Sequence, residues 1–397
     1  MFSSSASGGK ISSSSPEADS TAKRFQEWLS QAGLGETNPF GPLNAGEDPH
    51  LSRYLIRHDV FRAIWQDKPA IVFAPAGGGK SAFRARLAYA CRVEEDMRQV
   101  LAIPYIAPTP TMDLETHLEG ILRGAAQELL LRLTYRPATF TSLDDPACAA
   151  IRRALDQNDP GLLEQFLPQL EREGTTQPLV ETFDLSAAHL PAPAEPAQVH
   201  ALCTALAQIP PVPQVPPVAQ RWQDFFDLLF ATLHFEAVYI LVDGVDAFPE
   251  TIADPDAAAA VLFPLLAQMP HWAAQQVFLK LFLPLELAPV LPEPLTKPAK
   301  IDMITWTPEL LVELLHARLR AATNGEFDSL DAISAPSLRN AEAELLAGLP
   351  PLPREVLALL NRAIVEHVRR VGPTGGLEPE DIKAARRWYQ EERPFSP

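Results

Sequence analysis

A glycine-rich loop that ends in a lysine and a serine is the stretch of this sequence whose residues could do chemistry. Residues 74–81 read APAGGGKS, which is the spacing of a phosphate-binding loop with alanine in the first glycine position. Glycines let successive backbone amides approach phosphate oxygens without interference from Cβ atoms. The lysine can reach the β- and γ-phosphates of a nucleotide, and the serine hydroxyl can ligate Mg²⁺.

The loop therefore predicts a site for nucleotide phosphates. An apolar, strand-like run precedes it and a helical pattern follows, which is the context that phosphate binding requires. The alternative is a glycine-rich turn between strand and helix with an incidental lysine. On the first interpretation, the nucleotide-binding residues of this segment are Ala76, Gly77, Gly78, Gly79, Lys80, Ser81 and Ala82.

A carboxylate far along the chain supplies the second half of the predicted site. Asp243 follows the apolar run 238–242, and ligands bind at the carboxyl ends of strands in parallel sheets. We predict that Asp243 and Ser81 hold Mg²⁺, the alternative being a plain Asp-Gly turn. Asp246 is the candidate for positioning a water molecule. The alternative is that Asp246 only stabilises a turn or caps a helix. The predicted catalytic residues are thus Lys80, Asp243 and Asp246.

Two further basic residues could sense the γ-phosphate. Lys280 lies inside an otherwise apolar strand-like run, where a charge is costly unless it reaches a partner or the end of the sheet. Arg354 lies in the first turn of a helical stretch, where a positive charge opposes the helix dipole. The alternative for Lys280 is a side chain whose stem extends to solvent. The alternative for Arg354 is simple exposure on the surface.

The elements around these residues predict an α/β fold. Five short apolar runs alternate with helical patterns, as expected of a parallel five-stranded sheet flanked by helices. The runs are 69–75, 100–106, 238–242, 276–287 and 300–306.

Composition shifts divide the chain into five predicted segments. A Ser/Gly-rich stretch is expected to be a disordered tail, and a proline-rich stretch is expected to be an insertion with two to four short helices. The segments are the tail 1–22, the first part of the core 23–134, the insertion 135–220, the second part of the core 221–306, and a module of four helices 307–397.

Charge and hydropathy limit the classes of partner. The 397 residues carry a net charge of −17, which disfavours nucleic acid as a partner. No secretory signal is evident and no apolar run reaches the ~20 residues needed to cross a bilayer, so we expect a cytoplasmic protein without a membrane partner. Basic residues near the C-terminus alternate with acids, which is typical of a solvated helix face. They are Arg369, Arg370, Lys383, Arg386 and Arg387.

With these motifs in place, the chain resembles the AAA+/STAND group of P-loop ATPases over about residues 51–392, without the insertion. The segment 243–247 reads DGVDA and is similar to the group's DGhDE pattern, where h is apolar, with alanine in place of the final glutamate. The resemblance implies a P-loop core whose magnesium strand is not beside the loop strand, followed by a helical lid. It also implies that Ile56 and Arg57 contact adenine, that Lys280 is a first sensor, and that Arg354, in LPREV, is a second sensor.

The predicted function is that of an ATP-binding switch with Mg²⁺ as cofactor, in which ATP or ADP controls homo-oligomer assembly or a separate effector protein. The missing glutamate leaves two outcomes, slow hydrolysis or a protein that mainly holds nucleotide. An AAA+ DNA-associated ATPase, such as a transposition regulator or loader, is the alternative. A small-molecule kinase is a third possible function, but the sequence shows no recognisable site for a phosphate acceptor.

Overall fold

A computed structural model describes residues 16–391 of the chain, apart from 36–37, 46–47, 49, 55, 57, 98, 108–112, 184, 186–189 and 213. The chain forms two compact units, which we call the sheet unit and the helical unit. The sheet unit contains Leu43–Thr307 and Leu352–Arg354, and the helical unit contains residues up to Pro42, Pro308–Pro351 and residues from Glu355 on.

Five parallel strands form the sheet of the sheet unit, in the order β2-β3-β4-β1-β5. The predicted α/β class with a five-stranded parallel sheet flanked by helices is thereby confirmed. Because β4 lies between β1 and β3, the carboxyl ends of β1 and β3 are two strand spacings apart, about 10 Å. The strands are β1 (Ala70–Ala74), β2 (Val100–Ile106), β3 (Ala237–Asp243), β4 (Val277–Pro284) and β5 (Lys300–Met303).

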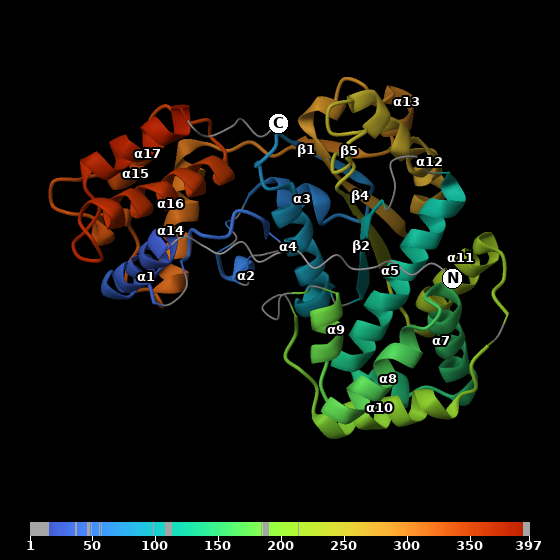
Figure 1. The fold of residues 1–397 in the computed structure, drawn as a ribbon. Helices are drawn as coiled ribbons and strands as arrows, with labels where there is room; N and C mark the ends of the chain where they lie inside the picture. Colours follow the sequence, from blue (N-terminus) through green and yellow to red (C-terminus); the bar gives the residue numbers. More distant parts are fainter. Residues whose placement is uncertain are drawn as a thin grey trace. The chain divides into compact units, whose positions relative to one another are not determined.

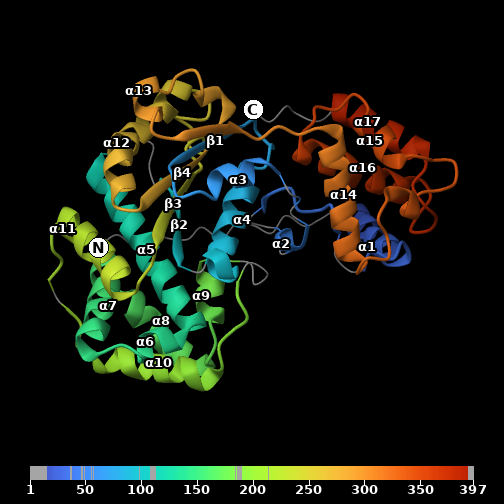
Figure 2. The ribbon, with the colours of Figure 1, turned by 180° about the vertical axis from the view of Figure 1, so that it is seen from behind.

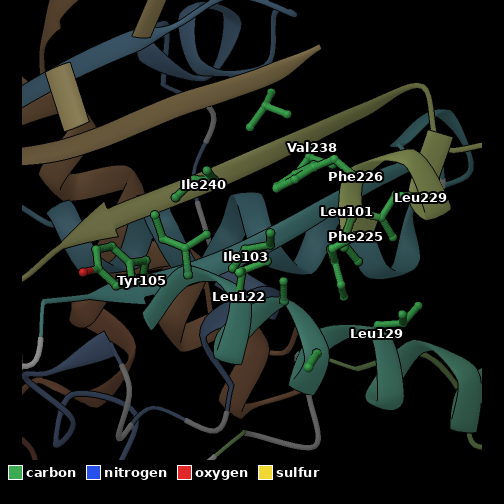
Figure 3. Packing of buried hydrophobic residues seen from close by; sticks show 14 of the residues in the cluster. Leu101, Ile103, Tyr105, Leu122, Leu129, Phe225, Phe226, Leu229, Val238 and Ile240 are labelled. Carbon is green, nitrogen blue, oxygen red and sulfur yellow. The ribbon is translucent and has the colours of Figure 1, made fainter. Parts of the chain in front are cut away.

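Both faces of the sheet are covered, which explains why its central strands read as continuous apolar runs rather than alternating ones. On β3, Val238 and Ile240 pack on one face while Tyr239 and Leu241 pack on the other. Figure 3 shows the first face, where side chains of β2 and β3 meet those of α5 and the segment around Phe225. Helix α4 covers the second face.

Some helices of the sheet unit begin at an aspartate cap. Asp113 precedes α5, and its side chain accepts a hydrogen bond from the Thr116 amide at 2.8 Å. Helix α12 is long and apolar enough to cross a membrane by length and composition, but it packs in the core beside β4. Among the helices of the sheet unit are α2 (Leu51–Tyr54), α3 (Val60–Ile64), α4 (Lys80–Val93), α5 (Leu114–Tyr135), α11 (Val218–Asp227), α12 (Pro255–Ala274) and α13 (Glu293–Thr296).

The predicted insertion 135–220 contains more helix than expected. Its described residues form five helices before α11, not two to four, and Pro168 lies inside one of them. Leu155, Phe166 and Leu202 belong to the same apolar cluster as the sheet residue Ile103. The insertion is therefore part of the sheet unit's core. Its helices are α6 (Pro137–Thr141), α7 (Asp145–Asn158), α8 (Leu162–Glu173), α9 (Gln177–Thr182) and α10 (Pro196–Gln208).

The helical unit joins the two ends of the chain. Among the described residues after the sheet there are four α-helices: α14 (Pro308–Ala322), α15 (Ala341–Leu346), α16 (Pro353–Arg370) and α17 (Pro379–Glu391). The N-terminal α1 (Pro16–Gln31) packs among them (Figures 1 and 2). Trp28 is fully buried, and its Nε1–H donates to the Gly375 carbonyl at 2.9 Å.

This division differs from the predicted one in two respects. Residues 23–42 belong with the C-terminal helices rather than with the start of the core. The predicted disordered tail 1–22 overlaps α1 from Pro16 on, and residues 1–15 lie outside the described residues. An apolar stripe on a helix predicts that this face is buried, but it does not predict which element covers it. Here α1 is covered by helices from the C-terminal part of the sequence.

A buried ion pair stabilises the helical unit. His367 Nδ1 lies 2.8 Å from Asp381 Oδ2, and His367 Nε2 lies 3.0 Å from the Thr374 carbonyl oxygen. Both neighbours only accept hydrogen bonds, so both ring nitrogens carry protons. Burial alone would lower the pKa of His367, but these hydrogen bonds outweigh it and raise the pKa. Hydrogen bonds to Asp381 likewise overcome burial and lower its pKa.

Replacing His367 by glutamine is expected to destabilise the protein by about 2 kcal/mol, because it removes a charged hydrogen-bond partner of the buried Asp381 carboxylate, which keeps its ion pair with Arg370. The contribution of the pair is largest between pH 3.8 and 6.5, the ordinary pKa values of the two groups. It is lost as pH rises through the raised pKa of His367, or falls through the lowered pKa of Asp381. Urea unfolding from below pH 3.8 to well above pH 6.5 measures the difference in stability from wild type, with the exposed His271→Gln as control. A difference that stays the same at every pH would contradict the pairing.

Candidate functional site

The loop of residues 74–81, which we call the glycine loop, connects the end of β1 to the start of α4. Gly77 and Gly79 have φ angles of 75° and 95°, a region that residues with a Cβ rarely adopt. Gly79 precedes the first residue of α4. The positive end of the helix dipole thus lies at the loop.

Several backbone amides of the glycine loop have no acceptor in the part of the chain that the structure describes. The Gly78 amide donates to the Pro75 carbonyl at 3.0 Å. Within the described residues, the next amides along the loop and the first turn of α4 donate to no group of the chain, namely those of Gly79, Lys80, Ser81 and Ala82. Ser81 is exposed and Gly79 is half-buried. Unpaired amides at a helix start attract an anion.

Two ionic contacts connect the start of α4 to the end of β3. Lys80 Nζ lies 3.9 Å from Asp246 Oδ2 and 3.3 Å from the Ala74 carbonyl oxygen. Arg84 Nε lies 3.3 Å from Asp243 Oδ2, and the other Asp243 oxygen accepts the Gly244 amide at 2.9 Å. The structure therefore brings the start of α4 with Lys80 to Asp243 and Asp246, which lie more than 160 residues later in the sequence.

Arg354 also lies at the glycine loop. Residues Leu352–Arg354 belong to the sheet unit, and the Arg354 amide lies 3.4 Å from the Gly77 carbonyl oxygen. A Cβ placed on Gly77 would come within 2.9 Å of the Arg354 Cβ. The Arg354 Nε is buried and has no hydrogen-bond partner among the described residues. The predicted second sensor is thus beside the loop with donor capacity to spare.

Lys280 is not at the glycine loop, and its prediction as a sensor is corrected. Lys280 pairs in register with Ala70, the first residue of β1, whereas the loop follows the last residue of β1. Its Nζ donates to the carbonyl oxygens of Gln66 and Lys68, the latter at 2.7 Å. It also lies 4.4 Å from the centroid of the Tyr239 ring. Lys280 therefore satisfies backbone acceptors at the amino edge of the sheet.

Lys280 is expected to make the stability of the protein depend on pH. Burial lowers its pKa from 10.5 to about 7, against the opposing influence of Asp67. Between pH 7 and 10 the unfolded chain binds more protons at this site than the folded one, so stability rises with pH. The rise is on the order of 3 kcal/mol, and Lys280→Met is expected to abolish it. Denaturant unfolding at both pH values measures this, and parallel pH profiles for the two proteins would contradict it.

The structure says less about the other residues predicted to bind nucleotide. Ile56 is buried and precedes His58, whose Nε2–H donates to the Thr305 carbonyl at 3.0 Å. Arg57, the predicted adenine contact beside it, lies outside the described residues. Ala76 is exposed and Ala82 is half-buried at the first turn of α4.

Two residues of the site were missed from the sequence. Arg84 lies four residues after Lys80 on α4 and therefore on the same helix face, a spacing that could have indicated it. Trp306 donates its Nε1–H to the Gly78 carbonyl at 2.8 Å. Nothing in the sequence marks this contact, because its acceptor is a backbone atom.

Comparison of the chain with protein-family models, curated proteins and solved structures found no match.

Proposed function

We propose that the protein binds ATP at the glycine loop and acts as a nucleotide-dependent switch of the AAA+/STAND type. The observation that carries the proposal is the set of unpaired amides at the start of α4, which has Lys80 beside it. This combination suits the β- and γ-phosphates of a nucleotide. Arg354 adds a second cation at the same loop.

Ser81 and Asp243 are the residues proposed to hold Mg²⁺. The described residues contain no group of three or more His, Cys, Asp or Glu side chains that could hold a metal ion by themselves. Mg²⁺ typically uses one or two protein oxygens and completes its shell with phosphates and water. A hydroxyl at the end of the loop and a carboxylate at the end of β3 fit that requirement, and bound Mg²⁺ would neutralise charge on the phosphates.

The arrangement of acids supports slow hydrolysis. Gly244 follows the proposed magnesium ligand, and Ala247 stands where the family pattern has glutamate. Asp246, proposed to position water, lies 3.9 Å from Lys80, so its charge is shared with a phosphate-binding cation. We therefore propose that nucleotide occupancy controls homo-oligomer assembly or a separate cytoplasmic effector protein.

The DNA-associated alternative is less well supported. In the helical unit, Arg369 pairs with Glu366, Arg370 pairs with Glu378 and Asp381, and Lys383 lies 3.9 Å from Glu380. Basic side chains that already have carboxylate partners offer little net charge to a phosphate backbone.

Titration calorimetry with ATP, ADP and AMP, with and without Mg²⁺, tests the proposal on the full chain. We expect ATP and ADP to bind, AMP to bind at least about 10-fold more weakly, and Mg²⁺ to strengthen ATP binding. Light scattering on the same samples then measures the change in mass. Equal affinities for ATP and AMP would contradict a site built around the terminal phosphates.

A further inference from the structure

Trp306 is the side chain that holds the backbone of the glycine loop from outside the loop. Its Nε1–H donates to the Gly78 carbonyl oxygen at 2.8 Å, and Gly78 is buried. We propose that Trp306 is a positioning residue for nucleotide binding that acts through the Gly78–Gly79 peptide. This inference rests on the proposed function, because it assigns a purpose to the shape of the same loop.

The geometry of a trans peptide explains how a contact to a carbonyl can aim an amide. The peptide unit is planar, and its C=O and N–H point in opposite directions. No cis peptide occurs among the described residues. When Trp306 holds the Gly78 oxygen on one side, the Gly79 N–H must point to the other. That N–H is one of the loop amides without an acceptor inside the described chain.

Three consecutive glycines make such a restraint necessary. Glycine adopts positive and negative φ about equally readily, so without a restraint the Gly78–Gly79 peptide could rotate at little cost. A fixed hydrogen bond removes that freedom before the ligand arrives, and pre-organised donors bind more tightly than donors that must first be ordered. Trp306 thus contributes to affinity without touching the phosphates.

Trp306 is itself fixed in place by the end of β5. The Ile304 amide donates to the Phe73 carbonyl at 2.8 Å, which extends the contact between β5 and β1. His58 donates to the Thr305 carbonyl at 3.0 Å, and its ring centroid lies 5.8 Å from that of Trp306. The backbone of the two residues before Trp306 is therefore held to β1 and to His58, which limits where the indole can lie.

The variant Trp306→Phe tests the proposal, with Trp65→Phe as its matched control. Both tryptophans are partly buried against the same apolar cluster, so both variants lose similar packing, but only Trp306 donates to the loop. Without nucleotide, we expect amide hydrogen exchange at Gly78 to be about 10-fold faster in Trp306→Phe than in Trp65→Phe. We also expect ATP affinity to fall about 10-fold in Trp306→Phe alone.

The possible results separate this inference from the proposed function. Wild-type protein that binds no ATP would contradict the function and with it the positioning role. Wild-type binding that Trp306→Phe leaves unchanged would overturn the positioning role alone. If Trp306→Phe does not fold, benzothienylalanine at position 306 keeps the ring size and removes only the N–H. Unchanged exchange and affinity in that protein would overturn the inference equally.

Discussion

Replacement of Lys80 by alanine is expected to weaken ATP binding on the order of 100-fold, about 3 kcal/mol. Lys80 is the cation at the start of α4, and among the described residues its Nζ has only the Ala74 carbonyl and a distant contact to Asp246 as partners. A terminal phosphate would replace these weak contacts with charge-assisted hydrogen bonds, which are the stronger kind. Titration calorimetry with ATP in the presence of Mg²⁺ measures the loss.

Lys297→Ala is the matched control for this variant. Lys297 is an exposed lysine at the end of α13 in the same unit, and its removal changes the net charge of the protein equally. We expect its ATP affinity to stay within about 2-fold of wild type. Equal affinities for Lys80→Ala and Lys297→Ala would show that the loop lysine does not contact phosphate.

Replacement of Asp243 by asparagine is expected to reduce the Mg²⁺-dependent gain in ATP affinity on the order of 100-fold. The Asp243 carboxylate is buried at the end of β3 and faces Arg84 at 3.3 Å. Asparagine keeps the shape and an acceptor for the Gly244 amide, but it lacks the negative charge that a divalent cation needs. Mg²⁺-free ATP binding is expected to remain, because the amides and Lys80 are unchanged.

The ratio of affinities with and without Mg²⁺ is the measurement that isolates this effect. Glu250→Gln, at an exposed acid seven residues further on, is the control and is expected to keep the wild-type ratio. An Asp243→Asn protein with the wild-type ratio would place the magnesium ligand elsewhere. A loss of binding both with and without Mg²⁺ would instead indicate that Asp243 acts through the structure of the loop.

The sequence predicted the elements of the sheet because their signals are local. Each of the five apolar runs became a strand, and Asp243 could be placed at a strand end because glycine follows it. The prediction for Lys280 failed because the sequence shows that this residue is in a strand but does not show the register of that strand. The pairing of Lys280 with Ala70 depends on residues more than 200 positions away.

Contacts between a side chain and a backbone atom were the other feature that could not be predicted from the sequence. The partner of Trp306 is a carbonyl oxygen, which every residue has, so no residue type at position 78 could indicate the contact. Arg84 was missed for a weaker reason, since its spacing from Lys80 places both on one face of α4. Side-chain pairs at helical spacing can be predicted from a sequence, whereas contacts between a side chain and a distant backbone atom cannot.

The pairing of α1 with the last helices has a consequence for synthesis on the ribosome. Trp28 reaches its partner Gly375 only 347 residues later. At 5–20 residues per second, that interval is roughly 17 to 70 seconds. During this interval the Trp28 indole, which is fully buried in the folded protein, lacks its hydrogen-bond partner. The nascent chain therefore presents an apolar helix face that chaperones can bind until residue 375 has been synthesised.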